Sequence, residues 1–154
     1  MTFRSTFIDG VHIVRWKEPQ LADIGVLVME IRRASEKCGK PIMGIAIMPL
    51  DSAPPPDDAR GAMARAMTEI LQWMETVHFV MEGRGFGSSI KRSALSGILL
   101  LGSKRGRVVV HANVEEALKT IAPKLTLPMR EFEEKGRRAG VFAPAADNRS
   151  GSIK

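Results

Sequence analysis

A glycine-rich segment at residues 83–89, GRGFGSS, combines residue types that proteins use to hold anions. Its three glycines leave backbone amides accessible, and either of its serines can cap the helix expected to follow. Free amides, the positive end of a helix dipole and nearby basic side chains together favour a phosphate or carboxylate. The sequence therefore predicts an anion- or partner-binding site made of Arg84, Gly85, Gly87, Ser88, Ser89, Lys91 and Arg92.

The distribution of charge singles out the same region. The chain of 154 residues carries a net charge of +6, and residues 83–112 alone contain six basic residues and no acidic one. The rest of the chain is therefore close to neutral. An alternative interpretation stays open, in which these basic side chains simply solvate an exposed helix and its loops.

The glycine spacing does not match the common nucleotide-binding motifs. GRGFG has GxGxG spacing instead of GxGxxG, and no Gly-Lys-Ser/Thr ending follows it. Phe86 is the one aromatic residue in the loop, so stacking on single-stranded nucleic acid is poorly supported. We expect a phosphate-bearing small molecule or an acidic protein surface in preference to nucleic acid.

Few other residues suggest chemistry. His12 and His78 are expected to open their strands and His111 to close its own, so the three should not converge on one metal ion. Ser88 with His111 is the one serine–histidine pairing that the strand order suggests, and no acid is placed to orient it. We predict no catalytic residue, no metal site and no cofactor.

The apolar pattern predicts alternating strands and helices. Asp9-Gly10 is a strong hairpin signal between two short apolar strands. After it, helical periodicity alternates with short β-branched runs, the pattern of parallel βαβ units. The expected strands are 2–8, 12–16, 42–48, 78–81 and 108–110, and the expected helices are 19–38, 57–74, 88–101 and 114–122. The predicted fold is α/β, an N-terminal β-hairpin followed by βαβαβα, with a mostly parallel five-stranded sheet and four helices.

The remaining composition bounds the class of protein. Residues 1–125 are expected to form a single domain, and residues 126–154 a charged, flexible C-terminal tail, because no apolar period survives after Pro128. Within that tail, residues 130–138 are compatible with a charged helical turn or two, and residues 139–154 are expected to be flexible. The single cysteine, Cys38, is expected to pack near the end of the first helix. No signal peptide or spanning segment is evident, which favours a cytoplasmic protein without membrane association.

This element order resembles the STAS family, the fold of bacterial anti-anti-sigma factors, over about residues 3–122. The likeness is greatest to divergent, uncharacterised STAS-like proteins, through the glycine loop and Ser89 to Leu95. The resemblance implies a non-catalytic regulatory module that docks a protein partner through its second and third helices. It also implies a phosphorylated serine after the third strand. Ser52 occupies that position without the family's second serine and glycine, and Ser88 is another candidate acceptor.

Two hypotheses on function thus come from the sequence. The first is the STAS-like interaction module, and the second is a binder of a phosphate-bearing or acidic ligand at the basic glycine loop. A homodimer is also expected, through the edge strand at residues 2–8 or through helices.

Overall fold

The computed structural model describes residues 2–17, 20–48, 57–82 and 107–144. In this part of the chain, a five-stranded sheet has the order β1-β2-β3-β4-β5. The strands are β1 (Phe3–Ile8), β2 (Val11–Trp16), β3 (Ile42–Met48), β4 (Met74–Met81) and β5 (Val108–His111). β1 is antiparallel to β2, and the other neighbours are parallel. The predicted α/β fold, with its N-terminal hairpin and mostly parallel sheet, is confirmed.

The hairpin forms where the sequence indicates. Ile8 pairs with Val11, which leaves Asp9 and Gly10 as a two-residue turn. Both turn residues have positive φ angles, 52° at Asp9 and 79° at Gly10. This is the backbone of the type I′ turn, whose twist matches that of the strands it joins. The Asp9 carboxylate also accepts a hydrogen bond from the backbone amide of Thr126 at 2.7 Å, tying the turn to the C-terminal part of the chain.

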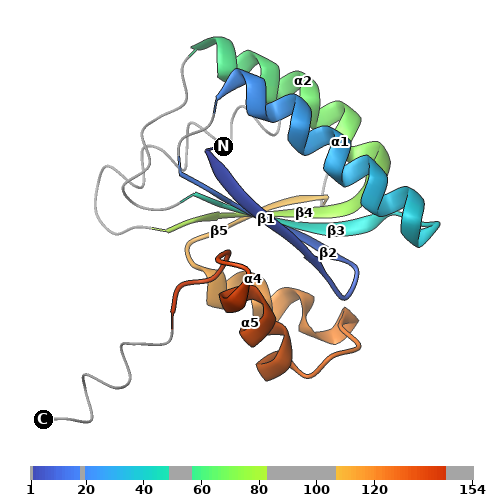
Figure 1. The fold of residues 1–154 in the computed structure, drawn as a ribbon, viewed down its shortest axis with the longest axis vertical. Coiled ribbons are helices and arrows are strands. Elements are labelled where there is room, and N and C mark those ends of the chain that lie inside the picture. The colour runs from blue at the N-terminus through green and yellow to red at the C-terminus, as the bar shows by residue number, and fades with distance from the viewer. Residues whose placement is uncertain (1, 18–19, 49–56, 83–106, 145–154) are drawn as a thin grey trace, which may run out of the picture.

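Helices cover both faces of the sheet (Figure 1). The first face carries α1 (Leu21–Cys38) and α2 (Asp57–Trp73), which pack against each other. The second face carries α4 (Val114–Ile121), the short 3₁₀ helix η1 (Ala122–Lys124) and α5 (Met129–Arg138). The described residues therefore contain four α-helices. The helix expected at residues 88–101 lies outside them.

Alternation along the strands divides the buried side chains between two cores. Residues of β3 and β4 that face α1 and α2 form the first core with Phe3, Val14 and Trp16. The intervening residues form the second core, under α4 and α5. β3 is buried along its whole length, as expected for a central strand covered on both faces.

Part of the charged C-terminal segment is ordered, and it includes the helical turns that the sequence allowed at residues 130–138. Residues 129–138 form α5, and its Phe132 side chain is completely buried in the second core. The chain then turns back, and Val141 and Phe142 bury beside it. The two buried positions of α5 and the partly buried Met129 sit among seven charged residues, so the apolar period is too sparse to see in the sequence. Residues 145–154 lie outside the described part.

Smaller corrections concern the helix ends. Cys38 is exposed at the end of α1, where Gly39 in the left-handed conformation stops the helix, and it does not pack as expected. Leu21, at the other end of α1, is half exposed. β4 begins at Met74, directly after α2, four residues earlier than the apolar run suggested. None of the described helices is long and apolar enough to cross a membrane.

Candidate functional site

The anion-binding residues predicted from the sequence, at positions 84–92, lie outside the described residues, as does Ser52. The structure does describe Glu82, immediately before the glycine segment. Its backbone amide donates to the Met48 carbonyl at 3.0 Å, and its carboxylate accepts from Arg15 Nη1 at 2.7 Å. Arg15 Nε donates in turn to the Val141 carbonyl at 2.7 Å. Arg15 therefore links β2 to the chain after α5 and to Glu82 at the end of β4, and the Glu82 amide bonds in turn to the end of β3.

The first sheet face holds a polar group between β2 and α1. His12 is buried, and its Nε2 lies 3.2 Å from Glu30 Oε1. The same carboxylate oxygen accepts a hydrogen bond of 2.6 Å from Ser5 Oγ. The hydrogen bond from His12 lowers the pKa of Glu30, against the opposing effect of its partial burial. Glu30 therefore stays ionised at neutral pH and fixes the orientation of the His12 ring.

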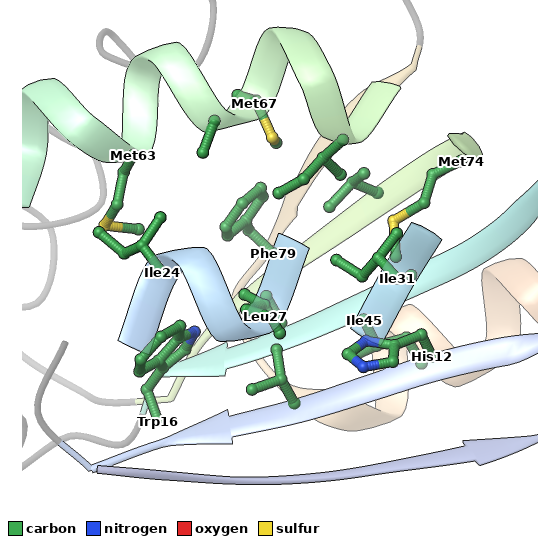
Figure 2. Close-up of a pocket in the computed structure, with 16 residues that line it drawn as sticks. His12, Trp16, Ile24, Leu27, Ile31, Ile45, Met63, Met67, Met74 and Phe79 are labelled. Carbon is green, nitrogen blue, oxygen red and sulfur yellow. The ribbon is translucent and has the colours of Figure 1, made fainter. Parts of the chain in front are cut away.

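His12 also lines an apolar cavity between the helical layer and the sheet. Figure 2 shows its imidazole on the β2 side of the cavity, with Ile31, Ile45 and Met74 nearby and Trp16 on the same strand. Met63 and Met67 of α2 lie on the opposite side. Aside from the His12 ring and the Trp16 indole, the side chains around the cavity are apolar.

The size of this cavity decides against a large ligand. Its volume is about 50 Å³. An engineered apolar cavity of about 150 Å³ is the size that admits benzene, and pockets for drug-sized ligands are several times larger. The cavity is therefore a small packing void in the first core, bordered by methionine side chains that can change conformation.

The second sheet face holds a different pair of histidines. His78 Nδ1 lies 2.9 Å from His111 Nε2, and both rings are buried under α4. Burial, followed by the charges of His111 and Lys124, lowers the pKa of His78 to about 4. Burial also lowers the pKa of His111, although Glu116 opposes this shift. Both rings are therefore neutral at pH 7, with one donating to the other.

The contact between His78 and His111 was not predicted from the sequence. The three histidines do not converge, as expected, since His12 lies on the opposite face of the sheet. His111 does end its strand as expected, but β4 begins at Met74, four residues before His78. All three histidines are buried, where strand-end or half-buried positions were expected. The register pairs Val80 with His111, and His78 with Val109, so the two histidines project from neighbouring strands on the same face. Parity of position in two adjacent strands is the signal that could have found them.

A shallow groove runs along the outside of the first helical layer. Its volume is about 390 Å³. Gly25 and Met29 line it on α1, and Ala62, Arg65 and Glu69 line it on α2. Of these residues, Met29 is 54% exposed. The α1 side of the groove is apolar, and the α2 side carries the charged Arg65 and Glu69.

No protein-family model, no curated protein and no solved structure matches this chain. Within residues 2–17, 20–48, 57–82 and 107–144, no group of three or more His, Cys, Asp or Glu side chains is arranged to hold a metal ion. The STAS resemblance, the anion site and the phospho-acceptor serines therefore remain predictions.

Proposed function

We propose that this protein is a cytoplasmic, non-catalytic regulatory module of STAS-like type that docks a protein partner. The docking surface includes the outer groove between α1 and α2. This proposal follows from the sequence-based hypothesis that a partner docks through the second helix, which is α2 in the structure. The third helix of that hypothesis lies outside the described residues.

The observation that supports docking is apolar exposure beside the groove. Leu21 and Met29 are 52% and 54% exposed, and each lies four residues from Gly25. Met29 and Gly25 line the groove, and Leu21 lies on the same side of α1, because residues four apart share one side of a helix. Large exposed apolar side chains beside a concave surface mark interaction sites more often than isolated ones do.

The shape and charge of the groove fit an amphipathic helix of the partner. Gly25 and Ala62 allow a bulky apolar side chain to enter between the two helices. Arg65 and Glu69 stand on the α2 rim with opposite charges, so the flanks of the incoming helix should carry both signs. This is the helix-in-groove mode, in which apolar residues spaced three and four apart provide the affinity.

The arrangement of the titratable groups fits a binding role. His12 and Glu30 hold each other on the first face, while His78 and His111 hold each other beneath α4. The two sets lie on opposite sides of the sheet, and each histidine is buried with its partner. The alternative function, binding of a phosphate-bearing or acidic ligand at positions 84–92, remains a prediction from the sequence.

Site-specific photo-crosslinking in cells tests the docking proposal. A photoreactive amino acid at position 29 should capture a defined protein, whereas one at position 115, exposed on α4 across the sheet, should not. The purified partner should then bind the Ala62→Arg variant at least about tenfold more weakly, because the long side chain fills the groove. Equal capture at both positions, or undiminished binding by a folded Ala62→Arg variant, would contradict the proposal.

A further inference from the structure

Within the described part of the chain, β1 lies at one edge of the sheet and presents unpaired backbone groups on its outer side. In the described residues β1 has one neighbour, β2. The Lys17 amide donates to the Thr2 carbonyl at 2.8 Å, so the backbone of Thr2 points toward β2. Because inward and outward amides alternate along an antiparallel strand, positions 4, 6 and 8 also bond to β2. The amides and carbonyls of Phe3, Ser5 and Phe7 therefore point away from the sheet.

We propose that a second copy of this chain pairs with β1, antiparallel, about a two-fold axis at Ser5. The interface is independent of the α1–α2 groove. It would join the two five-stranded sheets into one continuous sheet. An edge strand with unpaired backbone groups is a template for such pairing.

The positions of the outward groups select one register. When Ser5 lies opposite Ser5 of the second copy, Phe3 lies opposite Phe7 of that copy, and Phe7 lies opposite its Phe3. Each of the three outward positions then faces another outward position, which gives about six backbone hydrogen bonds. A shift of two residues in either direction leaves outward groups unpaired at both ends. A shift of one residue would place inward-bonded positions opposite outward ones.

The side chains agree with this register. Phe7 is 40% exposed on the face of β1 that also carries Phe3, which belongs to the first core. The pairing places the exposed ring beside Phe3 of the second copy, and aromatic cross-strand pairs stabilise sheets. Arg4, the one charged residue of β1, falls opposite Thr6 and does not meet its own copy.

α1 adds apolar surface next to this edge. Asp23 accepts from the Thr2 amide, and Glu30 accepts from Ser5, so this side of α1 faces β1. Val26 lies three residues after Asp23 and four before Glu30, which places it on the same side. Its side chain is 41% exposed. Val26 and Phe7 therefore flank the open edge, where the second copy would cover them.

Sedimentation equilibrium on a matched pair of variants tests the interface. Wild-type protein should dimerise, and Ser5→Pro should weaken the dimer at least about tenfold, because it removes the central outward amide on each copy. The Ser5 amide makes no bond to β2, so the hairpin should survive. Ser5→Ala, which also loses the hydroxyl but keeps the amide, should dimerise like the wild type. A monomeric wild type, or an unweakened Ser5→Pro dimer, would overturn the proposal.

Disulfide trapping tests the register without relying on proline. In a Cys38→Ser background, a mixture of Arg4→Cys and Thr6→Cys proteins should cross-link on oxidation. Positions 4 and 6 of the two copies would form a non-hydrogen-bonded pair with Cα atoms about 4.5 Å apart, within reach of a disulfide. Each variant alone should remain uncross-linked. Efficient cross-linking of Thr6→Cys with itself, or none in the mixture, would refute the Ser5-centred pairing.

Discussion

The two faces of the sheet bury histidines beside different partners and pack around side chains of different flexibility. On the α1–α2 face, His12 is held by the Glu30 carboxylate beside a methionine-lined cavity of about 50 Å³. On the α4–α5 face, His78 contacts His111, and the Phe132 and Phe142 rings pack with centroids 6.1 Å apart. The first face carries an ionised acid beside flexible methionine side chains, whereas the second carries two neutral bases and a pair of rigid aromatic rings.

This difference indicates where each face can tolerate change. Methionine has several rotatable bonds and can move into a neighbouring void, so the first core should absorb small changes of shape. Aromatic rings are rigid and move only as whole units, so the second core should absorb such changes less easily. The groove proposed to dock a partner lies over the adaptable core, while the C-terminal helix closes the rigid one.

The largest expected effect is from Phe132→Ala. The ring is completely buried, and its removal should lower the free energy of unfolding by about 3–5 kcal/mol. Met67→Ala, on the adaptable face, should cost about 2 kcal/mol, because the neighbouring methionines can partly fill the space. Urea unfolding measures both. Glu131→Ala on the exposed side of α5 serves as the control and should be nearly neutral.

A smaller loss from Phe132→Ala than from Met67→Ala would reverse the comparison. It would also revive the idea that the chain after residue 126 is a loosely attached tail. The sequence could not settle this point. Two buried positions in a ten-residue charged helix give no apolar period, and the burial of Phe132 depends on Val141 and Phe142, which follow the helix.

The parts of the fold that the sequence predicted are those specified by local signals. Asp9-Gly10 sets the hairpin, Asn113 caps α4 by accepting from the Glu116 amide, and Gly39 ends α1. The features it missed are set by contacts between segments far apart in the sequence. His78 and His111 meet through strand register, and Leu21 stays exposed although it fits the apolar period of α1. Of the predicted site, positions 84–92 lie outside the described residues, so the sequence remains their only support.

The second prediction concerns the dependence of stability on pH, which should differ between the two faces of the sheet. His78 has a pKa of about 4 in the folded protein against an ordinary value of 6.5, so the unfolded chain binds more protons between these values. The contribution of His78 to stability should therefore fall by on the order of 2–3 kcal/mol as pH drops from about 6.5 to 4, and this contribution then levels off. Lys124 adds to the cost of charging His78, whereas Glu116 favours the charged form of His111.

Two variants assign this acid response to its face. His78→Asn should make the decline between pH 6.5 and 4 shallower, as measured by urea unfolding across the range. Glu30→Gln should leave that decline in place. The pKa of Glu30 is lowered in the folded state, so its contribution is present above its ordinary value of 4.5 and is lost only as pH falls further. A decline that follows Glu30 instead of His78 would reject the assignment.

The third and smallest effect compares two glycines, one on each face, that both lack room for a methyl group. A Cβ at Gly136 would lie 2.1 Å from Cδ2 and 2.3 Å from Cε2 of the Phe142 ring. A Cβ at Gly44 would lie 2.6 Å from Sδ and 2.7 Å from Cε of Met74. The distances are similar, but Met74 has a flexible side chain that can swing into the adjacent cavity. The rigid Phe142 ring can yield only by moving as a whole out of the core, toward the groove that it lines between α4 and α5.

Gly136→Ala should therefore cost about 2 kcal/mol in urea unfolding, even though alanine favours a helix. Gly44→Ala should cost less than about 1 kcal/mol. Gly25→Ala, with nothing near its added methyl group, controls for the helical preference and should stabilise the protein by about 0.5–1 kcal/mol. If both crowded variants lost the same free energy, the cavity would give Met74 no freedom. The two cores would then differ in composition and not in their capacity to adapt.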